Sequence, residues 1–479
     1  MARFADHFGL GLTQYQLDFV NVPLHTDIQL FVDPYALGVA PDAWSQQCNG
    51  LVVSYFELVL QMIRAGREAE GRRLLSRLSE PNETHLGMSR NRPAGRSIGN
   101  IGAGLIYDRL AASRAVKSGL LQDLADCELL IPNIGRDKIS DITTNIVRTE
   151  LVRFTQSECK FYGIETRGVA QTLWNPDTQD WRSVYVELPV VQDDAGRDSA
   201  VILVPKVAVR LDLAYDVDKY YRNHVLEYLT AEHLDAGTGL VHVLKNGRRR
   251  VFKEDLKEIY PLTSEFVFKF SMEHEEVFEG YKQTVQDPGY VSNLNLELRE
   301  PDPQEFDLTS ALRALRALPP GPAGATAYHR QIRGILAAIF YPGLVNLIVE
   351  QEINEGRKRI DILADNVGSS DFFGRLRTRF DISSAFVPME CKNYSNELGN
   401  HELDQLLMRF SDRRGKFGIL LCRHIDNAEL LLKRRKDAAR DNGFFVLAFD
   451  DDNIADMCAA HTSRTLDDYL DERMRELLT

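Results

Sequence analysis

The alternation of apolar and polar positions is most regular between residues 328 and 450, where it predicts three helices and five strands. The amphipathic pattern that begins at residue 328 stops at Pro342-Gly343, a pair that helices do not continue through. The helices are expected at 328–340, 397–413 and 427–442, and the strands at 344–352, 358–365, 385–393, 417–422 and 444–449. The order α-β-β-β-α-β-α-β predicts an α/β region with a mixed central sheet flanked by helices.

The preceding part of the chain has a less regular pattern and predicts an α+β region without an internal repeat. Its expected elements are a strand at 25–32, a long helix at 51–78 bent at Gly66 or Gly71, a helix at 137–161, a hairpin of 181–191 with 199–212, and short strands within 239–251. Pro- and Gly-rich turns then surround a short helix at 308–318, which is typical of a linker. We therefore divide the chain into a region 1–285 of one or two subdomains, a linker 286–327, and a domain 328–479.

Two of the predicted strands carry charge where a core should be apolar. Asp361 lies between Ile360 and Ile362, and the strand at 385–393 contains Glu390 and Lys392. The two-residue period of a strand puts Glu390 and Lys392 on one face and the Cys391 side chain on the other. Two buried carboxylates are costly unless a cation lies between them, so this pattern predicts a metal site with a candidate catalytic base beside it.

The spacing of these residues, with the order of the elements around them, resembles the PD-(D/E)XK nuclease superfamily, whose fold is called restriction-endonuclease-like. The resemblance covers residues 328–450 only. It implies that Asp361, Glu390 and the backbone carbonyl of Cys391 hold Mg²⁺, for which Mn²⁺ substitutes. It also implies that Lys392 orients or deprotonates the attacking water. The expected activity is metal-dependent hydrolysis of phosphodiester bonds, with a DNA endonuclease favoured.

Two departures from the family pattern concern accessory positions. Many members carry a glutamate on the first helix, and residues 328–331 contain none. Glu350 or, more plausibly, Glu352 on the first strand stands in for it, so one metal ion and two remain alternatives. Some members also carry Gln-x-x-x-Tyr on the next helix, where this chain has Gln405 followed by Arg409. Gln405 is therefore an accessory candidate, and an ordinary helix position is the alternative.

The distribution of charge favours a polyanionic substrate near the predicted site. The chain has a net charge of −13, yet residues 329–440 contain 19 Lys and Arg against 15 Asp and Glu. Lys and Arg neutralise phosphates without regard to sequence. The candidate nucleic-acid-binding residues are Arg357, Lys358, Arg413, Arg414, Lys416, Lys433 and Arg434. DNA is favoured over RNA. A further basic run, 245–250, is expected to be an exposed turn, with contact to nucleic acid as the alternative.

Composition excludes several other classes. The N-terminus lacks a signal-peptide pattern, and the longest apolar stretch, 335–349, is too short and interrupted to span a bilayer. Six scattered cysteines without a Cys-x-x-Cys pair are typical of reduced thiols in a cytoplasmic protein and argue against a zinc finger.

Other readings of the function stay open. The C-terminal domain is either an active nuclease or a catalytically silent nucleic-acid-binding or scaffolding module. A structure-specific repair nuclease or junction resolvase is a third alternative. Nucleases with such appended regions often resemble bacterial anti-phage or restriction proteins, an analogy of fold rather than of site. Cleavage of both strands needs two sites, so we expect a homo-oligomer. The N-terminal region is expected to select the substrate, support oligomerisation, or sense a protein or small-molecule trigger.

Overall fold

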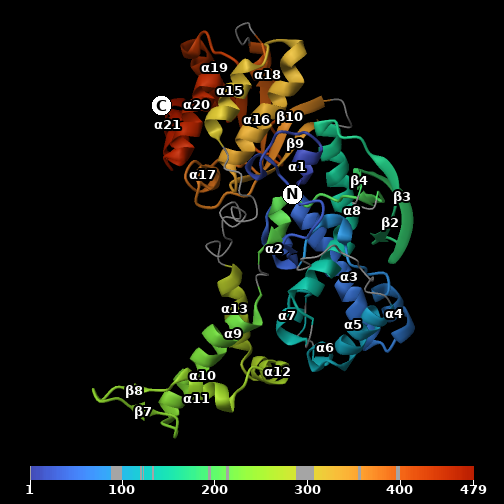
Figure 1. The fold of residues 1–479 in the computed structure, drawn as a ribbon. Helices are drawn as coiled ribbons and strands as arrows, with labels where there is room; N and C mark the ends of the chain where they lie inside the picture. Colours follow the sequence, from blue (N-terminus) through green and yellow to red (C-terminus); the bar gives the residue numbers. More distant parts are fainter. Residues whose placement is uncertain are drawn as a thin grey trace.

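The computed structural model describes residues 2–87, 100–118, 121, 123–131, 134–192, 196–211, 215–286, 307–353, 358–394 and 400–479, without the side chains of 100–103, 118, 350–353, 358, 359 and 400. Figure 1 shows the C-terminal region (residues 307–479) at one end of the molecule, the N-terminal region in the middle, and an elongated arm at the other end. No helix within the described ranges is long and apolar enough to cross a membrane.

The C-terminal region is built on a five-stranded mixed sheet. Its strands are β9 (Leu344–Ile353), β10 (Lys358–Asn366), β11 (Phe386–Lys392), β12 (Phe417–Cys422) and β13 (Phe445–Phe449). They lie in the order β13-β12-β11-β10-β9. Strand β10 is antiparallel to both of its neighbours, β9 and β11, and strand β12 is parallel to both of its neighbours, β11 and β13. The five strands and the mixed sheet expected from the sequence are present, with a helix between β10 and β11 that the expected order did not contain.

Helices pack on both faces of this sheet. One core joins the sheet to α15 (Leu308–Ala317), α16 (Ala325–Phe340), α17 (Phe372–Thr378), α20 (Asp451–Thr462) and α21 (Leu466–Leu478). A second core lies under α18 (Asn400–Leu407) and α19 (Ala428–Asn442). Successive residues of β12 face opposite cores, because Ile419 and Leu421 belong to the first and Leu420 and Cys422 to the second.

Three details of the C-terminal region differ from the expectation. Helix α17 between β10 and β11 was not predicted. Helix α18 ends at Leu407 rather than at 413, because a tight turn bonds Ser411 and Gly415 through both backbone groups. Gly415 has φ +127, and a Cβ there would lie 2.8 Å from the Cα of Ser384, so only glycine fits. The short helix in the expected linker is present as α15, and it packs into the C-terminal core.

The N-terminal region has one continuous apolar core. Its helices are α1 (Phe4–His7), α2 (Pro34–Val39), α3 (Ala43–Arg64), α4 (Glu68–Leu75), α5 (Asn100–Ala112), α6 (Arg114–Ser118), α7 (Cys127–Leu130) and α8 (Arg136–Tyr162). The predicted bend at Gly66 is confirmed, since α3 and α4 are separated there and Gly66 has φ +68. Helix α8 confirms the prediction for 137–161, with Ile139, Ile142, Ile146 and Leu151 buried as expected.

The strands of the N-terminal region were predicted less well. They are β1 (Phe31–Val32), β2 (Arg167–Asn175), β3 (Asp180–Leu188), β4 (Val190–Gln192), β5 (Asp198–Ala200) and β6 (Val209–Arg210). The expected hairpin of 181–191 with 199–212 is wrong over most of its length, because β3 pairs with β2, and β6 pairs with β1. Only β4 with β5 pairs as expected. Pro189 lies between β3 and β4 and cannot donate to a ladder, so one strand does not continue through it.

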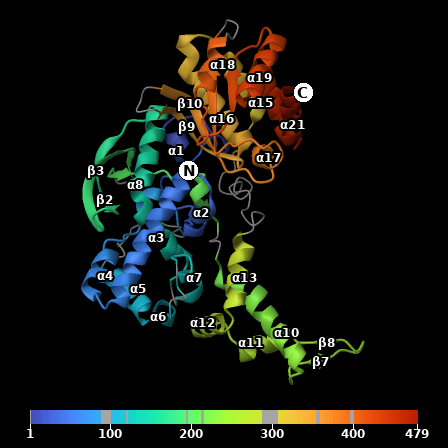
Figure 2. The ribbon, with the colours of Figure 1, turned by 180° about the vertical axis from the view of Figure 1, so that it is seen from behind.

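The arm (residues 216–286) extends away from both other parts in two opposite views (Figures 1 and 2). It consists of α9 (Val217–Tyr220), the π-helical turn η4 (Tyr221–Val225), α10 (Leu226–Ala236), β7 (His242–Val243), β8 (Arg249–Arg250), α11 (Lys253–Ile259), α12 (Ser264–Glu273) and α13 (Glu275–Gln286). The short strands expected within 239–251 are confirmed as the hairpin β7–β8.

A buried ionic network joins the N-terminal region to helix α16. Arg333, which is 2% exposed, donates to both carboxylate oxygens of Glu158 at 2.9 and 2.8 Å and to Asp18 Oδ2 at 2.8 Å. Asp18 Oδ2 also accepts from the backbone N–H of Leu347 in β9 at 2.9 Å. Nearby, Asn346 Nδ2 donates to Asp42 and Asp365, both at 2.9 Å. Polar groups buried this completely fix how the two regions are docked.

Candidate active site between strands β10 and β11

Asp361 lies where the pairing of β10 with β11 ends. The ladder pairs Asp365 with Phe386 and continues to Ile362 opposite Met389. Beyond that point the Oδ2 of Asp361 accepts a hydrogen bond from the backbone N–H of Cys391 at 2.9 Å. The carboxylate therefore takes the place of the backbone carbonyl that would accept this hydrogen bond if the two strands continued to pair. This holds it directly beside Glu390.

Glu390 and Lys392 lie on the face of the sheet that α18 covers. Lys392 Nζ donates to Glu390 Oε1 at 2.6 Å and to Gln405 Oε1 on α18 at 3.0 Å. The structure thus brings together Asp361, Glu390, Lys392 and Gln405, all four of which the sequence singled out. The Cys391 side chain points to the opposite face and is buried in the first core, as expected.

Burial and mutual repulsion shape the electrostatics of this group. Burial, and next the negative charge of Asp361, raise the pKa of Glu390, against the opposing charges of Lys392 and Arg409. Burial alone would lower the pKa of Lys392, but Glu390 and Asp361 outweigh it and the Lys392 pKa is raised. Lys392 is therefore a charged ammonium at neutral pH, which suits it to orient a group or stabilise negative charge better than to accept a proton.

His329 on α16 also reaches the site, and the sequence reasoning missed it. Its Nε2 lies 3.1 Å from the carbonyl oxygen of Cys391, which accepts the hydrogen bond when this nitrogen is protonated. The neighbouring Tyr328 anchors this end of the helix, because its hydroxyl donates to Asp451 Oδ1 at 3.0 Å. The signal was present in the first-helix position itself, where a polar side chain other than glutamate should have been considered.

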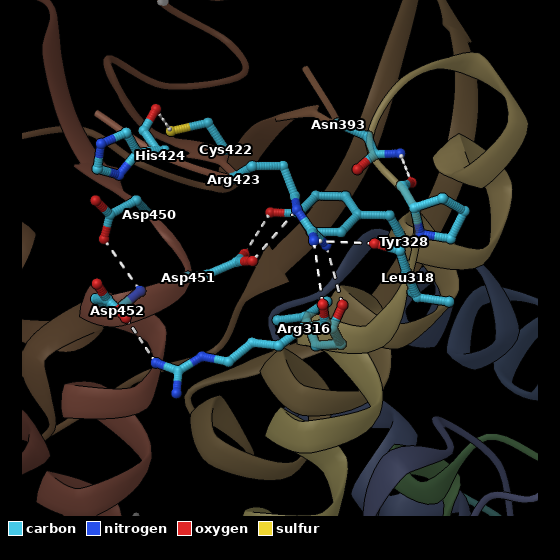
Figure 3. Close-up of polar contacts among 12 residues, drawn as sticks. Arg316, Leu318, Tyr328, Asn393, Cys422, Arg423, His424, Asp450, Asp451 and Asp452 are labelled. Carbon is cyan, nitrogen blue, oxygen red and sulfur yellow. Dashed lines mark hydrogen bonds and ion pairs between the residues drawn. The ribbon is translucent and has the colours of Figure 1, made fainter. Parts of the chain in front are cut away.

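Figure 3 shows how the carboxyl ends of the parallel strands hold this part of the structure in place. Arg423, directly after β12, stacks on the Tyr328 ring at 5.1 Å and pairs with Asp451 at 3.4 Å. It also donates to the carbonyl oxygens of Leu315 and Leu318 at the end of α15, each at 3.0 Å. A cation at the end of a helix satisfies its unpaired carbonyls.

Asn393, directly after Lys392, binds the segment that leads into α16. Its side-chain Nδ2 donates to the carbonyl oxygens of Pro319 and Gly321 at 3.0 and 2.9 Å, and its backbone carbonyl accepts from Gly321 N–H at 2.6 Å. A Cβ at Gly324 would lie 2.0 Å from the Pro319 carbonyl oxygen, so this tight approach requires glycine. The end of β11, and with it Lys392, is thereby fixed from the side of α15.

The donor set fits a divalent cation. Glu390 is 2% exposed, and within the described part of the chain its Oε2 has no hydrogen-bond partner. A buried carboxylate oxygen without a donor, beside a second carboxylate, is costly in the absence of a cation. Among the described side chains, no group of three or more His, Cys, Asp or Glu is arranged to hold a metal ion. Among the described residues, the oxygen atoms that could hold a cation here are those of the two carboxylates and the Cys391 backbone carbonyl.

The structure does not bring the other predicted site residues into this group. Arg357 and the side chains of Glu352 and Lys358 fall outside the described residues. The turn that contains Arg413, Arg414 and Lys416 lies at the opposite end of β11, since the Arg414 carbonyl accepts from Phe386 N–H at 2.9 Å. At 3.3 Å per residue, that end is about 20 Å from Lys392. The expected proximity of this basic turn to the site is therefore not observed.

The remaining basic residues differ in burial and in the carboxylates that their charges act on. On α19, Lys433 is exposed and pairs with Glu429 at 2.7 Å, and Arg434 is half-buried. Arg409, by contrast, is buried, and its charge acts directly on Glu390. Its Nε has no partner among the described residues. Arg409 is thus the basic residue after α18 that contributes to the electrostatics of the site.

Comparison with known proteins gives one match. Residues 9–216 match the model of a family described as "Domain of unknown function (DUF8370)". The match covers less than half of the chain and ends where the arm begins, so it leaves the arm and the C-terminal sheet outside. No curated protein and no solved structure matches the chain.

Proposed function

We propose that the C-terminal region is a metal-dependent nuclease with the restriction-endonuclease-like fold. The observation that carries this proposal is the group of Asp361, Glu390 and Lys392 at the end of β10 and β11, with one buried Glu390 oxygen left for a cation. The element order and the mixed sheet support it independently, because they are the ones that the family resemblance implies.

Asp361 and Glu390 would hold Mg²⁺, with Mn²⁺ as a substitute, and the Cys391 carbonyl would be a third ligand. A carbonyl oxygen has two lone pairs, so the hydrogen bond from His329 leaves one of them for the metal. When bound, the cation would lower the pKa of a water molecule and neutralise charge on the phosphate.

Lys392 acts as a fixed positive charge in this proposal. Its ammonium is held between Glu390 and Gln405, and its raised pKa keeps it protonated. It therefore stabilises the negative charge that develops on the phosphate, and it orients the attacking water by hydrogen bonding. Gln405 is a positioning residue, because it accepts from the Nζ of Lys392 and limits where that group can lie.

DNA is the proposed substrate, and cleavage of both strands would require two copies of the chain. A role in anti-phage defence or restriction follows from the family resemblance alone. The N-terminal region, docked on α16 through Arg333, is in contact with the same helix that carries His329. That shared helix is a route by which a trigger at the N-terminal region would influence the site.

The experiment compares cleavage of supercoiled plasmid by purified protein in Mg²⁺, Mn²⁺ or EDTA. Asp361→Asn, Glu390→Gln and Lys392→Ala are each expected to lower the rate at least about a hundredfold. Asp437→Asn is the matched control, because this exposed carboxylate on α19 pairs only with Arg440 among the described residues. Branched DNA and RNA run in parallel identify a junction resolvase or a ribonuclease.

A second readout does not depend on activity. Titration calorimetry with Mn²⁺ should give binding that Asp361→Asn and Glu390→Gln weaken and that Asp437→Asn leaves unchanged. Cleavage that survives in all three site variants would overturn the site assignment. Absence of cleavage on every substrate, with Mn²⁺ binding intact, would favour a silent binding module.

A further inference from the structure

The hairpin at the free end of the arm is a second charged surface, distinct from the candidate active site. We call residues 241–253 the ribbon. Its two strands pair His242 with Arg250 and Val243 with Arg249, and Gly247, with φ +79, closes the turn. Figures 1 and 2 show that it points away from the body of the protein in both views. Val243 is 71% exposed, so the described part of the protein leaves the ribbon largely uncovered.

The base of the arm is anchored firmly. Lys282 on α13 pairs with the fully buried Asp126 at 2.8 Å, and the Tyr281 hydroxyl bonds both the N–H and the carbonyl of Asp216, at 2.9 and 3.2 Å. From there α9, η4 and α10 form a continuous helical run over residues 217–236. At 1.5 Å per residue this run is about 30 Å long. The buried Val251 joins the ribbon to the apolar core that continues along the arm, and the turn of the ribbon lies beyond the end of this helical run.

Charge is distributed very unevenly along the arm. The ribbon contains five Lys or Arg and no Asp or Glu. The rest of the arm, residues 216–240 and 254–286, contains five Lys or Arg against thirteen Asp or Glu. A polyanion would thus be repelled by the helices of the arm and attracted by its tip. The chain as a whole has a net charge of −13, so the positive charge of the ribbon does not reflect a generally basic composition.

Of the five basic side chains of the ribbon, Lys253 at its end pairs with Glu227 at 2.6 Å, and the other four make no ion pair that the structure describes. None of Lys245, Arg248, Arg249 and Arg250 pairs with a carboxylate that the structure describes. Arg249 donates to the carbonyl of Leu234 at 2.6 Å, and Arg250 lies 5.1 Å from the centre of the Phe252 ring. Two of the four are thus held in place by neutral groups that leave their charge uncompensated, and Lys245 and Arg248 flank the turn.

We propose that the ribbon binds duplex DNA, through its backbone phosphates. A two-stranded ribbon is narrow enough to enter the major groove, and Lys and Arg at its tip would contact the phosphates on either side. Such contacts carry no sequence preference and confer affinity that falls steeply with salt. The inference rests on the proposed function, because the DNA gripped by the ribbon would be the substrate of the candidate active site. The ribbon would hold that DNA at a second point, some tens of ångströms from the anchor of the arm.

The test is fluorescence anisotropy of a labelled 40-base-pair duplex with the full-length protein in EDTA, from 50 to 300 mM KCl. The ribbon variant is Lys245→Ala, Arg248→Ala, Arg250→Ala. The control variant is Arg222→Ala, Lys257→Ala, Lys269→Ala, which removes the same charge from exposed positions on the helices of the same arm. We expect the ribbon variant to bind about tenfold or more weakly at 150 mM KCl and to lower the slope of log Kd against log salt by about 2 to 3. The control variant should match the wild type.

Equal binding by the ribbon variant and the wild type would overturn the inference and favour an acidic protein surface as the partner of the ribbon. Equal losses in the ribbon and control variants would also overturn it, because bulk charge would then explain the effect. The outcome is separable from that of the proposed function. A ribbon variant that loses DNA binding, beside an Asp361→Asn variant that still cleaves, would support the ribbon and contradict the active site.

Discussion

The buried Arg333 allows a prediction with a magnitude and a dependence on pH. Arg333 makes hydrogen bonds to Glu158, Asp18, Tyr162 and the Leu347 carbonyl, all in the interior between the N-terminal region and α16. Replacing it by methionine keeps most of the side-chain volume and removes the charge. Two buried carboxylates then lose their counter-ion, which typically costs about 3 to 5 kcal/mol.

The control is Arg330, which lies three residues before Arg333 on the same helix. Arg330 donates twice to the carbonyl of Phe161, at 3.0 and 2.7 Å, and has no carboxylate partner among the described residues. Arg330→Met should therefore cost only about 1 to 2 kcal/mol. The measurement is the free energy of unfolding in urea at 25 °C for the wild type and both variants.

The sign of the pH effect follows from Glu158. Burial raises its pKa, and the charge of Arg333 opposes that rise. Without Arg333 the folded-state pKa of Glu158 rises further above its unfolded value, so the folded variant binds more protons and loses stability as the pH increases. The deficit of Arg333→Met should be larger at pH 8 than at pH 5, whereas that of Arg330→Met should not change. Equal deficits in the two variants, or a deficit independent of pH, would refute the reasoning.

Three further predictions concern other parts of the molecule. His329→Ala should raise the Kd for Mn²⁺ about tenfold in calorimetry, because a residue that orients a metal ligand typically contributes that much, and an unchanged Kd would argue against its role. Relative to the wild type, Asp365→Asn should raise the free energy of unfolding by about 2 kcal/mol more at pH 8 than at pH 5. Burial raises the pKa of Asp365 to about 7, so the wild type loses stability as pH rises toward that value, and an equal gain at both pH values would contradict this cause. The six cysteines should resist Ellman's reagent in the native protein, since all are buried and their thiol pKa values are raised by burial; rapid labelling of any one would show an opening of its core.

The sequence predicted the C-terminal sheet well because its strands are short apolar runs separated by clear helix and turn signals. The same periodicity placed Glu390 and Lys392 on one face, and the structure agrees. It did not anticipate α17, which lies between β10 and β11 where the sequence offered only a connection. In the N-terminal region the alternation continued across Pro189, and the expected hairpin ignored the hydrogen bond that proline cannot donate.

Contacts between distant parts of the chain could not be read from periodicity. The basic turn 413–416 follows the candidate residues closely in sequence, but the parallel pairing of β12 with β11 takes it to the opposite end of the strand. Arg333 lies on an otherwise apolar helix, and its partners Asp18 and Glu158 lie more than 170 residues away in the sequence. His329 was overlooked because a carboxylate was sought at that position.

The most direct test of the central claim is the single-turnover rate of plasmid cleavage in Mg²⁺, measured side by side for the wild type and Lys392→Ala. The account predicts cleavage by the wild type that EDTA abolishes, and a rate at least about a hundredfold lower for Lys392→Ala. Equal rates in the two proteins, or cleavage that persists in EDTA, would contradict it.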